Sequence, residues 1–147
     1  MMDKKIKNVF REGAISSEFI ANSIAKHQVK TNIGAHNIFL GQVRADEVDG
    51  KQVEAIEYTA HVEMANIIFH EIREETFEKF DLTCMHIYHS IGLISAGEIC
   101  LFVFVSSPRR KQVFKALEFV VEEIKAKAPI FGKEIFEDST HQWKVNQ

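Results

Sequence analysis

The sequence contains few residues that break regular structure and none of the common metal or nucleotide motifs. Only 2 of its 147 residues are proline and 7 are glycine, which leaves no room for a disordered linker or a low-complexity segment. Its two cysteines, Cys84 and Cys100, lie in apolar runs and form no CxxC pair, so we expect buried thiols and no disulfide. GxGxxG, P-loop and HExxH motifs do not occur. We therefore expect no bound metal and no cofactor.

Long hydrophobic runs and a strong excess of charge are also missing. No run of about 18 apolar residues occurs, and the lysine-containing N-terminal segment lacks the apolar core of a signal peptide. This predicts a cytoplasmic protein that does not associate with a membrane. The formal net charge is −3, so the chain as a whole is not built to bind nucleic acid. An anion site would have to be a local cluster of cations.

Length and hydrophobic patterning predict one domain over residues 1–147, with an N-terminal arm at 1–14 and a C-terminal tail at 135–147. Gly34 and Gly41 mark places for a bulge or a close approach, Asp49-Gly50 marks a turn, and Ser16 or Ser17 can cap the first helix. Helices interleaved with strand pairs indicate an α+β fold, or a mixed sheet with helices on one face. Helices are expected near 16–27, 62–80 and 108–127, and strands near 32–44, 53–60, 82–94 and 99–105, with one short strand in the tail.

The expected third helix begins with cations where acids are usual. Ser107 is a suitable N-cap and Pro108 a suitable first residue, and the next three residues are Arg109, Arg110 and Lys111. The positive end of the helix dipole disfavours them unless an anion binds there, and free backbone N–H groups together with guanidinium groups suit a phosphate. The alternative is three solvated surface cations.

A second group of cations follows the same helix. Lys125 and Lys127 in "IKAKAPIFGKE" are either cations that stabilise a helix C-terminus or part of a site, and Arg44 ends the first long strand. If Arg44, the Arg109–Arg110 turn and Lys125 converge, they form a pocket for a phosphorylated small molecule. No protein nucleophile is evident. His86 and His89 are three apart in a strand, so they point to opposite faces and make a poor metal pair.

Four segments, in this order and spacing, resemble the MoaE family, the catalytic (large) subunits of molybdopterin synthase. They are "GAHNIFLGQVR", "IEYTAHVEMA", "IYHSIGLISAGEICLFVFVSSPRRKQVF" and "IKAKAPIFGKE", and the similarity runs from about Ile15 to Trp143. The resemblance implies an α/β-hammerhead fold with an added small antiparallel β-subdomain. It also implies a sulfurtransferase that builds the dithiolene of molybdopterin from cyclic pyranopterin monophosphate during molybdenum cofactor biosynthesis.

The resemblance further implies a partner and an assembly. Sulfur would arrive as a C-terminal Gly-Gly thiocarboxylate on a small ubiquitin-like subunit of the MoaD type. Two large subunits would form a homodimer within a heterotetramer. The rival hypothesis from the residues alone is a non-enzymatic α+β adaptor that binds a phosphorylated ligand or an acidic peptide tail.

Site residues follow from the same resemblance. Lys125 matches the lysine considered essential in the family, and many members carry a second lysine where this chain has Gly132. Either Lys133 substitutes for this lysine through a small backbone shift, or that role is weaker in this chain. Lys125 and Lys133 are the two predicted catalytic residues, and Lys127 is expected to be a solvated helix-end cation. The predicted substrate-binding residues are Gln42, Val43, Arg44, Arg109, Arg110, Lys125, Gly132, Lys133 and Glu134, with Phe39 as a candidate pocket-lining residue.

Overall fold

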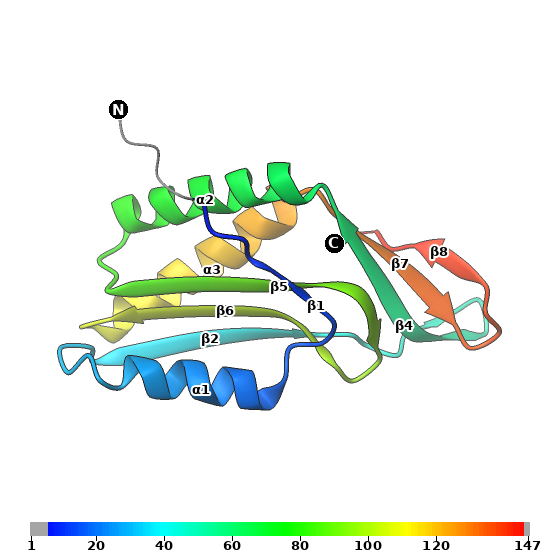
Figure 1. Cartoon of the computed structure of the whole chain (residues 1–147), viewed down its shortest axis with the longest axis horizontal. Coiled ribbons are helices and arrows are strands. Elements are labelled where there is room, and N and C mark those ends of the chain that lie inside the picture. The colour runs from blue at the N-terminus through cyan, green and yellow to red at the C-terminus, as the bar shows by residue number, and fades with distance from the viewer. Residues whose placement is uncertain (1–5, 146–147) are drawn as a thin grey trace.

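Three helices and eight strands make up the described part of the chain, residues 6–145 of the computed structural model (Figure 1). Residues 1–5 of the predicted arm and 146–147 of the predicted tail lie outside it. The α+β class expected from the sequence is confirmed. The helices are α1 (Ser17–His27), α2 (Val62–Lys79) and α3 (Arg110–Lys127). The strands are β1 (Phe10–Glu12), β2 (Ala35–Gln42), β3 (Glu47–Val48), β4 (Lys51–Ala60), β5 (Cys84–Ser95), β6 (Ile99–Ser107), β7 (Ile130–Phe136) and β8 (His141–Trp143).

The long strand β5 joins two parts of one sheet, whose order is β2-β6-β5-β4-β7-β8. Its first residues, Cys84–His89, pair with β6, and its last residues, Gly92–Ser95, pair with β4. Strand β1 lies parallel to β5 at their junction. Strands β3, β4, β7 and β8 are paired antiparallel and form the β-subdomain, which projects at the right of Figure 1.

Helices cover both faces of the main sheet, with α1 on one face and α2 and α3 on the other (Figure 1). The alternation of β6 explains this, because its side chains are buried on both sides. Phe102 and Phe104 pack with residues of α1, while Val103 and Val105 belong to the core under α2 and α3. Over residues 6–145, no helix is both long enough and apolar enough to cross a membrane.

Several local predictions are confirmed. Ser16 caps α1, with its side chain accepting a hydrogen bond from the Phe19 N–H at 3.1 Å. Asp49 and Gly50 both have positive φ, as the tight turn between β3 and β4 requires. At Gly34 a Cβ would lie 2.2 Å from the Pro108 carbonyl oxygen, so only glycine permits this approach. A register shift follows Gly41.

Two local predictions are wrong. Ser107 is not the N-cap of α3: it ends β6, its hydroxyl donates to the Asp81 carbonyl at 2.7 Å, and the helix starts at Arg110 with Arg109 as cap. The strand ladder continues further than the capping pattern suggests. The helical spacing of Met64, Ile67, Ile68 and Ile72 predicts that they form the buried face of α2, but Met64 is 57% and Ile67 43% exposed. The residues of α2 that are buried are Ala65, Phe69, Ile72 and Thr76.

Candidate functional site

Lys125 lies where two hollows adjoin, between the C-terminal end of α3 and the β-subdomain. The inner hollow measures about 410 Å³ and the outer hollow about 480 Å³, and both are lined by Lys125, Trp143 and Lys144. The inner hollow is also lined by Tyr58, His89, Ile124, Ala126, Ala128, Ile130, Phe131 and Gly132. The outer hollow is also lined by Arg44, Asp46, Val48, Glu134, Gln142 and Val145.

The amphipathic pattern of α3 determines the position of Lys125. Val120 and Ile124 are buried one turn apart, so Lys125 emerges at the edge of the buried face, in the last turn of the helix. Lys127 follows two residues later on another side, exposed, with its Nζ 2.6 Å from a carboxylate oxygen of Glu123. It is the helix-end cation that the sequence predicts. Only a short connection then leads into β7, which returns beside Lys125.

Buried polar groups form the floor of the inner hollow. His89 is 4% exposed, and its Nδ1 donates to the Ser90 carbonyl at 2.7 Å, which leaves Nε2 as a hydrogen-bond acceptor. Burial lowers the pKa of His89 to about 4, and the positive charge of Lys125 adds to this. The Tyr58 hydroxyl donates to the Cys100 sulfur at 3.5 Å, and burial raises its pKa. Both rings are therefore neutral at pH 7.

The outer hollow combines cations with carboxylates. The Nε of Arg44 donates to Asp46, and this hydrogen bond lowers the pKa of the Asp46 carboxyl group. Glu134 is buried and accepts a hydrogen bond from Gln142 Nε2 at 3.0 Å. An incoming anion would have to compete with Asp46 for Arg44.

The sequence also predicts that Gln42 and Val43, which precede Arg44, bind the substrate. Val43 is buried, and its backbone bonds to Glu98 and Gly97. Gln42 is exposed at the end of β2. Neither lines a described hollow.

The structure does not place Lys133 where it could take the role of the family's second lysine, whose position Gly132 occupies. Gly132 lines the inner hollow, and a Cβ there would lie 3.0 Å from Cγ2 of Ile56, so a larger residue requires a shift. Lys133 points to the opposite face of β7 and lines neither hollow. Its Nζ lies 3.2 Å from a Glu57 carboxylate oxygen and 5.9 Å from the centre of the Trp143 ring. The position of Lys133 outside both hollows therefore does not support a catalytic role for this residue.

Within one chain, Arg44 and Lys125 line the same hollow, but Arg109 and Arg110 do not join them. Arg110 and Lys125 are the first residue and one of the last residues of α3, so they lie about 22 Å apart along its axis. Arg109 precedes the same helix start. Phe39 packs against the core and lines neither described hollow. Of the predicted binding residues, the structure gathers only Arg44, Lys125, Gly132 and Glu134 around the two hollows.

Comparisons with known proteins identify the family of this chain. The family model described as "MoaE protein" matches residues 14–127. The chain belongs to the MoaE family. The molybdopterin synthase catalytic subunit of Bacillus subtilis is 38% identical over 125 residues, which cover 85% of this chain and 78% of that protein.

Solved structures of MoaE-like chains share the fold. The crystal structure of molybdopterin synthase from Staphylococcus aureus has a TM-score of 0.82 and 32% identity, covering 96% of this chain and 99% of that chain. A Helicobacter pylori structure, described as a complex of subunits 1 and 2 of molybdopterin-converting factor, has a TM-score of 0.78. Its identity is 17% over 95% of this chain and 92% of that chain, so it shows the fold alone.

Several lining residues of this MoaE chain are not predicted from the sequence, among them Tyr58, His89, Trp143 and Lys144. Trp143 and Lys144 reach the hollows because β8 pairs with β7, a contact that hydrophobic periodicity does not reveal. The one available signal is that Trp143 is the single tryptophan of the chain. Together, Trp143 and Phe131 add exposed aromatic rings beside three cations, an arrangement suited to a flat, anionic ligand.

Proposed function

We propose that this chain is the catalytic subunit of a molybdopterin synthase. It transfers sulfur from the C-terminal thiocarboxylate of a small ubiquitin-like subunit to cyclic pyranopterin monophosphate and so forms the dithiolene of molybdopterin. The observation that carries the proposal is the position of Lys125, where two hollows adjoin, in a chain of the MoaE family. Curated relatives named as molybdopterin synthase catalytic subunits support the reaction class.

The chemistry requires a group that stabilises negative charge. The thiocarboxylate sulfur bonds to a side-chain carbon of the pterin and displaces the oxygen substituent of that carbon, which leaves as phosphate oxygen or as water. Water then cleaves the bond between this sulfur and the acyl carbon, and a second transfer supplies the other sulfur. The small subunit is left with a C-terminal glycine carboxylate. Attack by water places a negative charge on the acyl oxygen, and the ammonium group of Lys125 stabilises that charge. Attack by a neutral lysine amine would instead end in a stable amide, which stops sulfur transfer.

The two hollows match the two reactants in size and lining. Pockets of about 300–1,000 Å³ hold small ligands, and both hollows fall within this range. Trp143 and Phe131 offer aromatic surface to the flat pterin. Arg44, Lys125 and Lys144 offer positive charge to a phosphate or to the thiocarboxylate. The neutral floor formed by His89 and Tyr58 keeps further charge away from the reacting atoms.

In this proposal, a second copy of the chain supplies Arg109 and Arg110 to the site. A single small substrate does not span the roughly 22 Å between Arg110 and Lys125 of one chain. In a homodimer with two-fold symmetry, the helix start of one copy can lie beside the Lys125 hollows of the other. Arg109 and Arg110 would then bind the substrate phosphate. A small subunit at each end of this dimer completes a heterotetramer.

The test is a reconstitution from purified components. The chain is mixed with cyclic pyranopterin monophosphate and a thiocarboxylated small subunit, and dithiolene formation is measured. We expect multiple turnovers when thiocarboxylate is in excess, and none when the small subunit ends in an ordinary carboxylate. Binding of the phosphorylated ligand without any dithiolene product would contradict the proposal and favour the non-enzymatic adaptor.

A further inference from the structure

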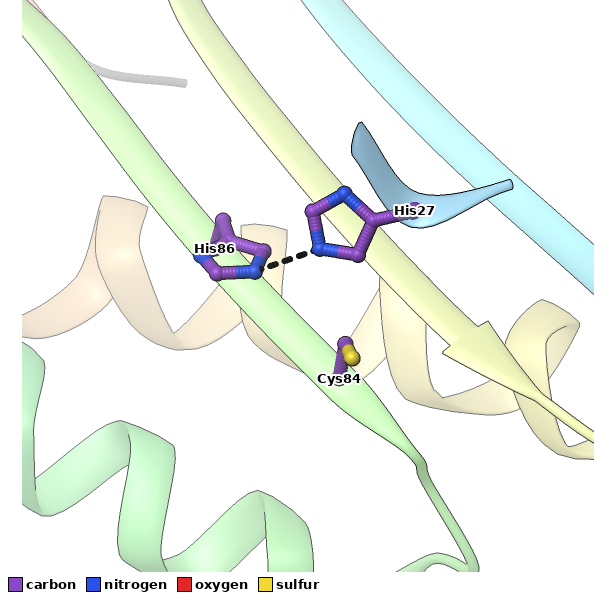
Figure 2. Close-up of side chains that lie close together, drawn as sticks. All are labelled: His27, Cys84 and His86. Carbon is purple, nitrogen blue, oxygen red and sulfur yellow. Dashed lines mark hydrogen bonds between the residues drawn. The ribbon is translucent and has the colours of Figure 1, made fainter. Parts of the chain in front are cut away.

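Three side chains with metal-binding atoms meet on the face of the sheet that α1 covers (Figure 2). His27 is the last residue of α1, and Cys84 and His86 lie two apart on β5, so they share a face. The Nε2 atoms of His27 and His86 are 2.8 Å apart, and the ligand atoms of all three residues lie within 4.8 Å of one another. His89, beside the Lys125 hollows, is on the other face of β5.

The surroundings of the cluster fix the orientation of one imidazole. Nδ1 of His27 donates to the Ser23 carbonyl at 2.7 Å, so its Nε2 directs a lone pair toward the cluster. In many metal-bound histidines, the ring N–H that faces away from the metal donates to a backbone carbonyl in the same way, and this hydrogen bond orients the ring. His27 and Cys84 are buried, and the ring of Phe104 lies 4.8 Å from that of His27, centre to centre. The cluster is therefore largely shielded from water.

We propose that His27, Cys84 and His86 bind a transition metal ion, with Zn²⁺ as the best match. One thiolate and two imidazoles are ligands that zinc prefers, and the cluster has no carboxylate that would suit Ca²⁺ or Mg²⁺. Tetrahedral zinc needs ligand atoms about 3.3–3.7 Å apart, so the two rings must separate slightly and the sulfur must move closer. The fourth position is open to water or another ligand.

This site goes beyond what the sequence predicts, because His27 and Cys84 are far apart in the chain. The sequence alone predicts no metal site, and it rejects His86 and His89 as a metal pair because the two side chains point to opposite faces of the strand. Folding brings the end of α1 against the start of β5 and so creates the donor set.

Lys30 competes with the metal for the sulfur. Its Nζ lies 2.9 Å from Cys84 Sγ, and Lys7 and Arg73 add further positive charge around His86. When the metal binds, Cys84 releases its thiol proton to solvent, and His86 carries its ring proton on Nδ1 in place of Nε2. The Lys30 side chain must move away. Lys30 is exposed on the segment that follows α1, so this movement is open to it. Replacing Lys30 with an uncharged residue of similar length should therefore strengthen metal binding.

Cobalt spectroscopy gives the first test. Reduced, metal-free protein is titrated with Co²⁺, and near-ultraviolet absorption by the bond between thiolate and cobalt is recorded. We expect one Co²⁺ per chain, displaced by Zn²⁺, with the band lost in Cys84→Ser and retained in Cys100→Ser, which removes the other buried thiol. His86→Gln should weaken binding by about 100-fold or more. Absence of the band, its survival in Cys84→Ser or its loss in Cys100→Ser would overturn the proposal.

A second test uses a variant that leaves all three ligands and the core intact. Lys30→Met removes the competing charge from an exposed side chain, so the Kd for Zn²⁺ should fall about tenfold. An unchanged or higher Kd would contradict the proposed competition at Cys84. Zn²⁺ should also raise the Tm of the wild type and of Lys30→Met. Neither readout involves dithiolene formation, so this proposal fails or holds independently of the proposed catalytic function.

Discussion

Arg110 and Lys125 lie at opposite ends of α3, about 22 Å apart along the helix axis. Both carry positive charge and both are predicted to contact one small substrate, which a single chain cannot arrange. The proposed homodimer resolves this by drawing the two residues of one site from two copies. The two copies should therefore be able to complement each other.

The first prediction uses mixed dimers. Arg110→Ala and Lys125→Ala chains are co-expressed with different affinity tags, and the mixed dimer is isolated. One of its two sites then contains both defects and the other contains neither, so about half of the wild-type activity should return. Dithiolene formation is the measurement, and each homodimeric variant serves as a control. A mixed dimer as inactive as its parents would show that the shared site is wrong.

Lys133 provides the second prediction. Because its ammonium group pairs with Glu57 outside the two hollows, Lys133→Ala should leave turnover within about threefold of the wild type. Glu57→Gln removes the other half of the same pair and is the matched control. Turnover is measured at saturating substrate. A loss of 100-fold in Lys133→Ala alone would mean that Lys133 has taken over the role of the family's second lysine.

The third prediction concerns pH and His89. Its pKa is about 4 in the folded protein, below the usual 6.5, so the unfolded chain binds a proton between these values and the folded chain does not. Stability from this group is therefore complete above about pH 6.5 and is lost as pH falls toward 4. At pH 5 the loss amounts to about 2 kcal/mol.

Urea unfolding at pH 7.5 and pH 5 measures this effect in the wild type and in His89→Gln. The pKa values of His36 and His86 are also lowered by burial, so the relevant quantity is the difference between the two proteins. The variant should lose about 2 kcal/mol less stability than the wild type over this interval. Equal losses in both proteins would show that His89 is not held neutral by burial.

Much of the fold follows from short-range patterns in the sequence. The continuous apolar run of β6 predicts a strand buried on both faces, and Ser16 and the Asp49-Gly50 pair mark a helix start and a turn. These signals succeed because capping, turn geometry and periodicity involve only neighbouring residues. The start of α3 is mispredicted because pairing with the neighbouring strands extends β6 to Ser107.

The candidate site was less predictable because tertiary contacts create it. Lys125 and Arg44 stand out in the sequence through the family resemblance, and both line the outer hollow. Tyr58 and Trp143 reach Lys125 only through the pairing of β4, β7 and β8, which no local pattern encodes. The separation of Arg110 from Lys125 follows directly from helix geometry once both residues are placed on one helix.

The most direct test of the central claim compares Lys125→Ala with Lys127→Ala. Both changes remove one lysine from the last turn of α3, but only Lys125 lines the hollows. With cyclic pyranopterin monophosphate and thiocarboxylated partner, turnover should fall by about 10²–10³ in Lys125→Ala, while fold and partner binding persist. Lys127→Ala should stay within about twofold of the wild type. Equally mild effects at the two positions would contradict a catalytic role for Lys125.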